Sequence, residues 1–207
     1  MSKFTLSFLL FGTLFFTGCH TLAHSHEKAG HSTVASSEPS IGVAAPVFSG
    51  SDTHGKTHRL SDYKGKFVVL EWFNPECPAV RPHYANHSMQ NLQRAYTGMG
   101  VVWLTIDSSA PGKQGHLTPD QGEAVLKERN AAPTALILDS DGKIGRTFGA
   151  KTTPHMFVID PKGKLIYAGA IDDRNGKNFV QAALDEAMAG KPVSVPATQS
   201  YGCSVKY

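Results

Sequence analysis

Three short apolar runs, separated by segments with helical character, constrain the fold of this chain more than any other feature. They cover residues 67–73, 101–107 and 134–139, and each is nearly continuous in apolar residues. Strands of this kind are typical of parallel sheets that are covered on both faces by helices. The sequence therefore predicts an α/β domain with a central sheet flanked by helices.

The segments between these runs supply the predicted helices. We expect a helix after the first run with Cys77 as its N-cap and Pro78 as its first residue, since proline has no N–H to lose there. Glycines at 98 and 100 end this helix. Residues 118–121 form a capping box, which predicts a second helix to about Asn130. The inward stripe of the first helix is predicted to be Val80, Tyr84, Met89, Leu92 and Tyr96.

A hairpin and a last helix complete the predicted domain. Residues 156–160 and 164–170 flank a Pro-Lys-Gly turn and indicate two antiparallel strands, which makes the predicted sheet mixed. A helix is expected over residues 177–189, before a Gly-Lys-Pro stop. Its inward residues are predicted to be Phe179, Ala183, Leu184 and Met188. A chain of 207 residues is long enough for one such domain with a sizeable core.

The first nineteen residues have the layout of an export signal. Lys3 precedes an apolar run that is shorter than the ~20 residues a membrane-spanning helix needs. The ending "FTGC" resembles the lipobox of bacterial lipoproteins, although phenylalanine stands where leucine is usual. We therefore expect residues 1–18 to be a signal peptide and Cys19 to carry lipid, with a plain cleaved signal or a retained anchor as alternatives. His20, rather than aspartate, follows Cys19, and this favours an outer-membrane lipoprotein that faces the periplasm.

Three further segments are predicted after the signal. Residues 19–40 form a flexible tether with four histidines, residues 41–190 the folded domain and residues 191–207 an extended tail. Clustered imidazoles can bind copper or zinc, but irregular spacing and the lack of a cysteine among them favour a solvated linker. The net charge is +3 and the basic residues are scattered, which excludes a nucleic-acid partner.

Four motifs occur in order along the predicted domain: "APVFSGSDTHGKTHRLSDYKGK", "VVLEWFNPECP", "KTTPHMFVID" and "IDPKGKLIY". From about residue 41 to residue 188 the chain resembles the redoxin group of thioredoxin-fold proteins. This group includes the thiol-specific antioxidant proteins and the extracytoplasmic TlpA-like oxidoreductases. The resemblance implies a thioredoxin-like fold and thiol redox chemistry that needs no cofactor. The implied partners are protein or small-molecule thiols and disulfides, with peroxides as an alternative.

Cys77 is the candidate nucleophile. A thiolate at a helix N-terminus faces unpaired backbone N–H groups, here those of Ala79 and Val80, and the positive end of the helix dipole. Such a position lowers a cysteine pKa from ~8.5 into a range of roughly 3.5 to 7.5. Arg81, one turn later, would favour the thiolate by its charge. The alternative is a buried, inert thiol.

The resemblance assigns roles to further residues. Glu71 matches the buried acid that relays protons in thioredoxins, and a carboxylate buried in a sheet suggests a use or a raised pKa. A side chain that reaches solvent at the strand end is the open alternative. Thr153 and Pro154 match the cis-proline loop that lies beside the nucleophile and binds extended substrate. An ordinary proline at a strand entry is the alternative there. Asn74 is expected to contact substrate or to cap its loop, and Pro78 to contact substrate.

The chain departs from each of these redox families at decisive positions. Thioredoxins have a second cysteine where this chain has Val80, and Sco-type copper chaperones have one at the position of Arg81. Peroxiredoxins have a threonine or serine at the position of Asn74 and a proline at that of Leu70. Their peroxide-polarising arginine falls at Pro154. Cys77 therefore has no local partner.

The tail offers a partner in Cys203. If Cys19 carries lipid, Cys77 and Cys203 are the remaining thiols, and exported proteins seldom leave two thiols unpaired. An extended tail spans about 3.3 Å per residue and can reach the helix start. Cys203 is predicted to resolve intermediates on Cys77, while a permanent structural bridge and an intermolecular bond stay open.

The predicted function is exported thiol-disulfide exchange, with thiol peroxidase as runner-up. Disulfide exchange is favoured because Pro154 keeps the thioredoxin loop and the peroxide-activating arginine is missing. Two other classes are open: a copper-delivery module that uses Cys77 with the tether, and a redox-inactive binding domain bridged by Cys77 and Cys203. His83 and His87 have the spacing of a metal pair on one predicted helix, but two ligands rarely make a site, and a solvated helix face is favoured.

Overall fold

The protein is described by a computed structural model over residues 39–207. The predicted signal peptide, Cys19 and nearly all of the tether lie outside the described residues. In the part that is described, no helix is long and apolar enough to cross a membrane.

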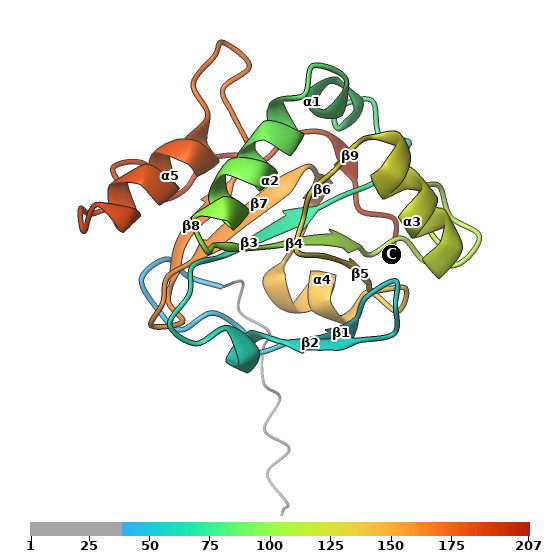
Figure 1. Ribbon diagram of the computed structural model, residues 1–207, viewed down its shortest axis with the longest axis horizontal. Coiled ribbons are helices and arrows are strands. Elements are labelled where there is room, and N and C mark those ends of the chain that lie inside the picture. Colours follow the sequence, from blue (N-terminus) through green and yellow to red (C-terminus); the bar gives the residue numbers. More distant parts are fainter. Residues whose placement is uncertain (1–38) are drawn as a thin grey trace, which may run out of the picture. The chain divides into compact units, whose positions relative to one another are not determined.

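A five-stranded mixed sheet forms the centre of the domain, as predicted (Figure 1). Its strands lie in the order β5-β4-β3-β7-β8. The three apolar runs become the parallel strands β3, β4 and β5, and the hairpin becomes β7 and β8, which are antiparallel to their neighbours. The bounds are β3 Val68–Trp72, β4 Val102–Asp107, β5 Ala135–Leu138, β7 His155–Ile159 and β8 Leu165–Gly169.

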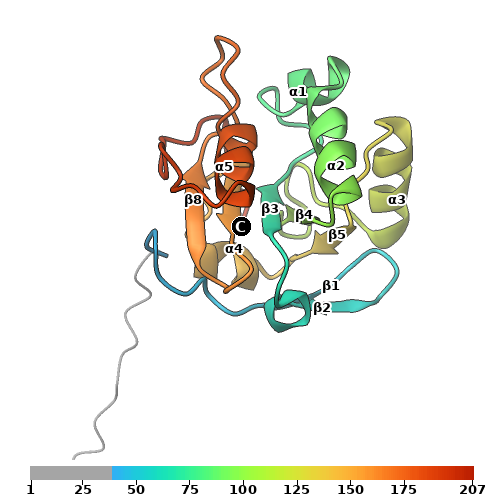
Figure 2. The ribbon, with the colours of Figure 1, turned by 60° about the vertical axis from the view of Figure 1, so that its left-hand side comes forward.

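Helices cover both faces of this sheet because successive strand residues point to opposite sides. In β3, Val69 packs into a core with α2, α3 and α5, whereas Leu70 packs into a second core with α4. Figure 2 shows α2 and α5 side by side on their face of the sheet. The N-terminal hairpin and a 3-10 helix lie on the α4 side. The bounds are α2 Ser88–Gly98, α3 Pro119–Glu128, α4 Lys143–Phe148, α5 Phe179–Met188, β1 Ser49–Ser51, β2 Thr57–Arg59 and η1 Leu60–Tyr63.

The prediction of one helix that begins at Cys77 is wrong in two respects: the helix begins later, and it is divided into two helices. Residues 78–80 form turns, and helix α1 covers only Arg81–Ala85. Pro82 has no N–H to donate to the carbonyl of Pro78, so the bond from the Arg81 amide to the Cys77 carbonyl is not followed by the next helical bond, and residues 78–80 stay outside the helix. His87 then takes a left-handed conformation with φ of 62° and separates α1 from α2. The predicted inward stripe is nevertheless buried at all five positions.

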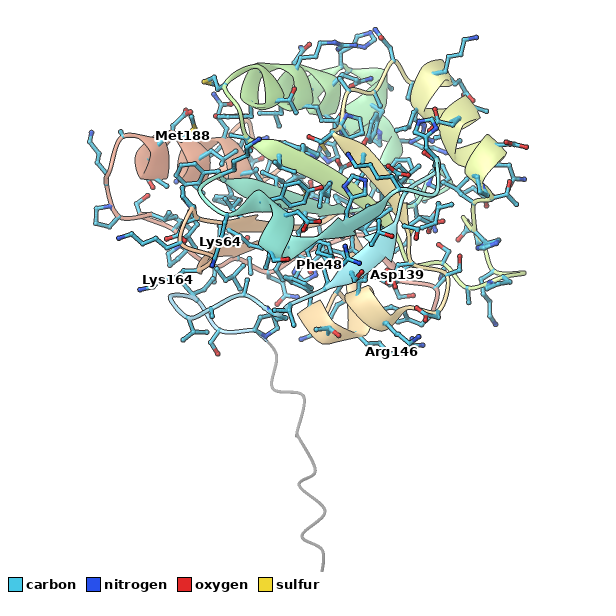
Figure 3. All side chains as sticks on the ribbon, turned by 60° about the horizontal axis from the view of Figure 1, so that its bottom comes forward. Phe48, Lys64, Asp139, Arg146, Lys164 and Met188 are labelled. Carbon is cyan, nitrogen blue, oxygen red and sulfur yellow. The ribbon has the colours of Figure 1, made fainter. Side chains whose placement is uncertain are left out.

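Two other differences concern the C-terminal part of the chain. Met188 is 39% exposed at the end of α5 and is not an inward residue as predicted (Figure 3). Val180 is buried on that helix instead. The tail is extended as predicted, but it also forms a strand, β9 (Cys203–Ser204), which pairs with β6 (Thr152–Thr153). Neither this pairing nor helix α4 was expected.

Candidate active site

Cys77 lies in a turn that follows β3, and its side chain is fully buried. The amide groups of Val80 and Arg81 donate to the Cys77 carbonyl oxygen at 3.0 and 3.1 Å. Asn74 holds the loop before it, because its Oδ1 accepts from the Glu76 amide at 2.8 Å and its Nδ2 donates to the Gln114 carbonyl at 3.1 Å. Asn74 therefore caps its loop, and its contact with substrate stays a prediction.

The loop before β7 lies beside this cysteine. The Thr153–Pro154 peptide bond is cis, as the resemblance implied. The Cys77 thiol donates a hydrogen bond to the Thr153 carbonyl oxygen at 3.1 Å. The Thr153 hydroxyl is buried and has no hydrogen-bond partner among the described residues. This hydroxyl is therefore free to turn toward a thiolate.

The tail brings Cys203 to the same place. In the antiparallel pairing of β6 with β9, Cys203 lies directly opposite Thr153. Both cysteines are free thiols, and they lie close enough for each to shift the acidity of the other. Cys77 is buried, whereas Cys203 is partly exposed. The fold thus gathers four predicted site residues, from three distant parts of the chain, around one sulfur: Cys77, Thr153, Pro154 and Cys203.

The two thiols differ in acidity. Burial opposes ionisation of Cys77, but the side chains of Cys203 and Thr153 and the backbone amides of Cys203 and Ala79, which can donate to a thiolate at this position, outweigh it and lower its pKa. Burial raises the pKa of Cys203, as do its hydrogen bond to Cys77 and the charge of the Cys77 thiolate. The first proton is therefore lost from Cys77, while Cys203 keeps its own. The backbone donor from Ala79 agrees with the sequence prediction, but the Val80 amide is used by the turn.

Glu71 is a buried acid in the middle of the sheet. Its carboxylate accepts hydrogen bonds from Tyr84, Trp103, Gln93 and Thr105 at 2.7 to 3.1 Å. Burial raises its pKa, against the opposing effect of these donors. The alternative in which Glu71 reaches solvent is wrong, because its side chain is fully buried. None of the hydrogen bonds found within residues 39–207 joins it to a cysteine, so its bonds tie α1 and α2 to the sheet.

A cavity of about 460 Å³ lies next to the cysteine turn. Pro78 and Ala79 form one wall and Tyr201 from the tail forms another. Tyr201 donates a hydrogen bond to Asp172 at 2.6 Å and contacts His83 Nε2 at 3.1 Å. The full lining is Pro78, Ala79, Pro82, His83, Asp172, Arg174 and Tyr201.

His83 is therefore not on a solvated helix face, as the sequence had suggested. It is buried against Tyr201 and lies 3.7 Å from an Asp172 oxygen, while His87 is exposed and belongs to the break between α1 and α2. In the described part of the chain, no three potential metal ligands cluster. Sequence reasoning missed Tyr201, Asp172 and Arg174. The one feature of the local sequence that could have drawn attention to this part of the site was Gly202, directly before Cys203 in the extended tail.

Comparison with known proteins places the chain among thiol redox proteins. The profile of the AhpC/TSA family matches residues 41–168. The chain is 29% identical over 148 residues to the thiol-disulfide oxidoreductase ResA of Geobacillus thermodenitrificans, which is 69% of this chain and 77% of that protein. It is 30% identical over 150 residues to the thioredoxin peroxidase of Fasciola hepatica, which is 68% of this chain and 75% of that protein. The crystal structure of the exposed lipoprotein thioredoxin of Streptococcus pneumoniae aligns with a TM-score of 0.50 at 25% identity, over 68% of this chain and 99% of that one.

Proposed function

Because this chain belongs to the AhpC/TSA family, we propose that it is a two-cysteine thiol-disulfide oxidoreductase in which Cys77 attacks the substrate and Cys203 resolves the intermediate. The observation that carries this assignment is the β6–β9 register, which sets Cys203 opposite Thr153 and within hydrogen-bonding contact of Cys77. A second cysteine far away in the sequence thereby takes the place of the local partner that the chain lacks.

The first step is attack by the Cys77 thiolate on one sulfur of a substrate disulfide. A bond forms between Cys77 and that sulfur, the substrate S–S bond breaks, and the other half leaves as a thiolate. In the second step the Cys203 thiolate attacks Cys77 in this mixed disulfide, and the remaining substrate sulfur leaves. The substrate gains two electrons, and the protein loses two as the Cys77–Cys203 disulfide forms. An external dithiol then restores both thiols.

The electrostatics of the pair support this order of events. The charge on Cys77 and its hydrogen bond help to raise the pKa of Cys203 in the reduced protein. When the Cys77 sulfur becomes part of a mixed disulfide it is neutral, so both of these effects disappear. Cys203 then ionises more readily, at the stage when a second nucleophile is needed.

The experiment compares Cys77→Ser with Cys203→Ser under a disulfide substrate and a dithiol reductant. We expect Cys77→Ser to lose activity, because the first attack depends on its thiolate. Pre-reduced Cys203→Ser, mixed with the disulfide substrate after the dithiol has been removed, should complete one attack and accumulate a mixed disulfide on Cys77, which mass spectrometry detects. Full activity in Cys77→Ser, or no trapped adduct in Cys203→Ser, contradicts the proposal.

A thiol peroxidase is the second candidate, favoured by the similarity to the thioredoxin peroxidase of Fasciola hepatica. Its Cys77 would attack a peroxide oxygen, the O–O bond would break, and Cys203 would then condense with the sulfenic acid and release water. Against it, the donors that lower the Cys77 pKa most are side chains of Cys203 and Thr153 and backbone amides, not an arginine. Peroxide consumption that outpaces disulfide reduction, with sulfenic acid trapped on Cys77, would place this candidate first.

The proposal includes export and a lipid anchor. Removal of residues 1–18 would leave Cys19 as the lipidated N-terminus, with residues up to 40 as a tether on the periplasmic side of a bacterial membrane. The lipobox-like ending at Cys19 supports this location. So does the similarity to a lipoprotein thioredoxin of Streptococcus pneumoniae. The substrates would then be thiols and disulfides of exported proteins.

A further inference from the structure

The C-terminal strap, residues 200–207, is held across the active site along its whole length. The Tyr201 hydroxyl bonds to Asp172 at one end of the strap, and β9 pairs with β6 in its middle. At the other end, the Ala110 amide donates to the Lys206 carbonyl at 2.8 Å and the Tyr207 hydroxyl donates to the Ala150 carbonyl at 2.8 Å. The strap is thus a folded element of the domain.

The docked strap leaves no access to the nucleophile. Cys77 is fully buried, and the strap cysteine is in direct contact with it. A sulfur atom of an external disulfide must reach Cys77 to be attacked. The strap therefore has to leave before an external disulfide can react.

Its departure would uncover an edge that suits an extended peptide. Among the described residues, β9 is the one strand that pairs with β6. The backbone groups of β6 on that side would then be unpaired, and an extended segment pairs with such an edge through main-chain hydrogen bonds. An incoming peptide that adopts the strap's register places its own cysteine opposite Thr153, beside Cys77.

The strap also indicates which residue must precede that cysteine. Gly202 has a φ of +118°, and a Cβ atom there would lie 2.0 Å from the Thr153 carbonyl oxygen and 3.0 Å from the Ala79 Cβ. A side chain at this point would meet backbone that cannot move aside easily. In this register, only glycine fits between the cis-proline loop and the cysteine turn.

The residue before the glycine lies in the cavity beside the cysteine turn. The Tyr201 ring forms part of its wall, and the Arg174 guanidinium lies 3.9 Å from the ring centroid. A flat ring with a polar tip satisfies both this cation and the partly buried His83–Asp172 pair. An aromatic residue is therefore preferred two positions before the cysteine.

We propose that the β6 edge and the adjoining cavity bind an extended substrate peptide of the form aromatic-glycine-cysteine, and that Tyr201-Gly202-Cys203 is an internal copy of this peptide. This inference rests on the proposed disulfide exchange at Cys77. The peptide, whose cysteine is part of a disulfide, displaces the strap. The Cys77 thiolate attacks the sulfur of that cysteine, the disulfide bond of the peptide breaks, and the former partner leaves as a thiolate. The strap then returns to the same edge, where Cys203 attacks Cys77 and the reduced peptide leaves. Because the strap is tethered, it competes at a high effective concentration, and a peptide that lacks the matching residues is excluded.

The first experiment measures the exposure of Cys77 without any substrate. In full-length Cys203→Ser, iodoacetamide alkylates Cys77 at a rate that reports strap opening, read on the high-pH plateau where the thiolate fraction is constant. Adding Gly202→Ala should accelerate alkylation about tenfold or more, because the clash with Thr153 raises the open fraction. Gly176→Ala is the matched control, since Gly176 also has a positive φ, +112°, but a Cβ atom at that position would have no neighbour within 4 Å. An unchanged rate in Gly202→Ala, or equal acceleration in Gly176→Ala, overturns the inference.

The second experiment tests the substrate motif. Synthetic peptides Ser-Tyr-Gly-Cys-Ser, Ser-Tyr-Ala-Cys-Ser and Ser-Ser-Gly-Cys-Ser, each activated as a disulfide with thionitrobenzoate, are mixed with full-length Cys203→Ser. We expect the first peptide to release thionitrobenzoate about tenfold faster than the other two, relative to their rates with free dithiothreitol. Equal relative rates for the three peptides overturn the motif but leave disulfide exchange intact. Failure of Cys77 to react with any of them, although iodoacetamide alkylates it, refutes the proposed function itself.

Discussion

Oxidation of the cysteine pair should stabilise the domain strongly. A Cys77–Cys203 disulfide closes a loop of more than about 100 residues. In the chain-entropy model, closing such a loop lowers the conformational entropy of the unfolded state and raises its free energy by about 4.7 kcal/mol. The folded state should lose little in return, because the two thiols are already in contact and β9 is already paired with β6 in the reduced protein. We therefore expect the free energy of unfolding to rise by about 4 to 5 kcal/mol on oxidation.

Thermal unfolding followed by circular dichroism tests this value. For a domain of this size, each kcal/mol shifts the Tm by roughly 2 to 4 °C, so the oxidised protein should melt at least about 8 °C above the protein in excess dithiol. Cys203→Ser is the control, and its Tm should not depend on the reductant. The disulfide is verified by mass spectrometry before each scan. An oxidised protein that melts at or below the reduced one would show that the bond strains the docked strap, and the reasoning would be wrong.

Three further outcomes are expected. Glu71→Gln keeps an oxygen for three of the four donors and should lower the free energy of unfolding by no more than about 1 kcal/mol. Glu71→Met leaves four buried donors unpaired and should lower it by about 4 kcal/mol or more, as measured in denaturant titrations. Equal losses would contradict this account. Burial raises the pKa of Asp107 from 3.8 to about 6. The folded protein then holds a proton that the unfolded chain releases, so stability falls as pH rises from about 4 to 6, and Asp107→Asn should remove about 3 kcal/mol of this dependence. A denaturation midpoint with the same pH profile in both proteins would refute it. Cys19→Ser should move the protein from the membrane to the soluble fraction, since lipid contributes ~0.8 kcal/mol per buried CH₂, and unchanged fractionation would exclude lipidation there.

Elements that depend on local patterns could be predicted from the amino-acid sequence alone. The continuous apolar runs became β3, β4 and β5, and the capping box at Thr118 starts α3 with both of its reciprocal hydrogen bonds formed. The sequence placed Cys77 directly after β3 but predicted a helix where the structure has a turn, and the cis peptide before Pro154 was implied by the resemblance to thioredoxin-fold proteins, not by local geometry. Burial on two faces and end-of-helix hydrogen bonds act over a few residues, so they leave a readable signal.

The tertiary structure decided where the tail goes and what surrounds each reactive group. No periodicity in residues 191–207 indicates that Cys203 pairs with Thr153, because that pairing depends on a strand edge formed about fifty residues earlier in the chain. The full burial of Glu71 depends on donors from α1, α2 and β4, which the pattern of its own strand does not encode. The need for glycine at 202 exists only because the Thr153 carbonyl and Ala79 approach from two other segments. Contacts between distant parts of the chain carry no local signature, and for this protein they decide which sulfur meets Cys77.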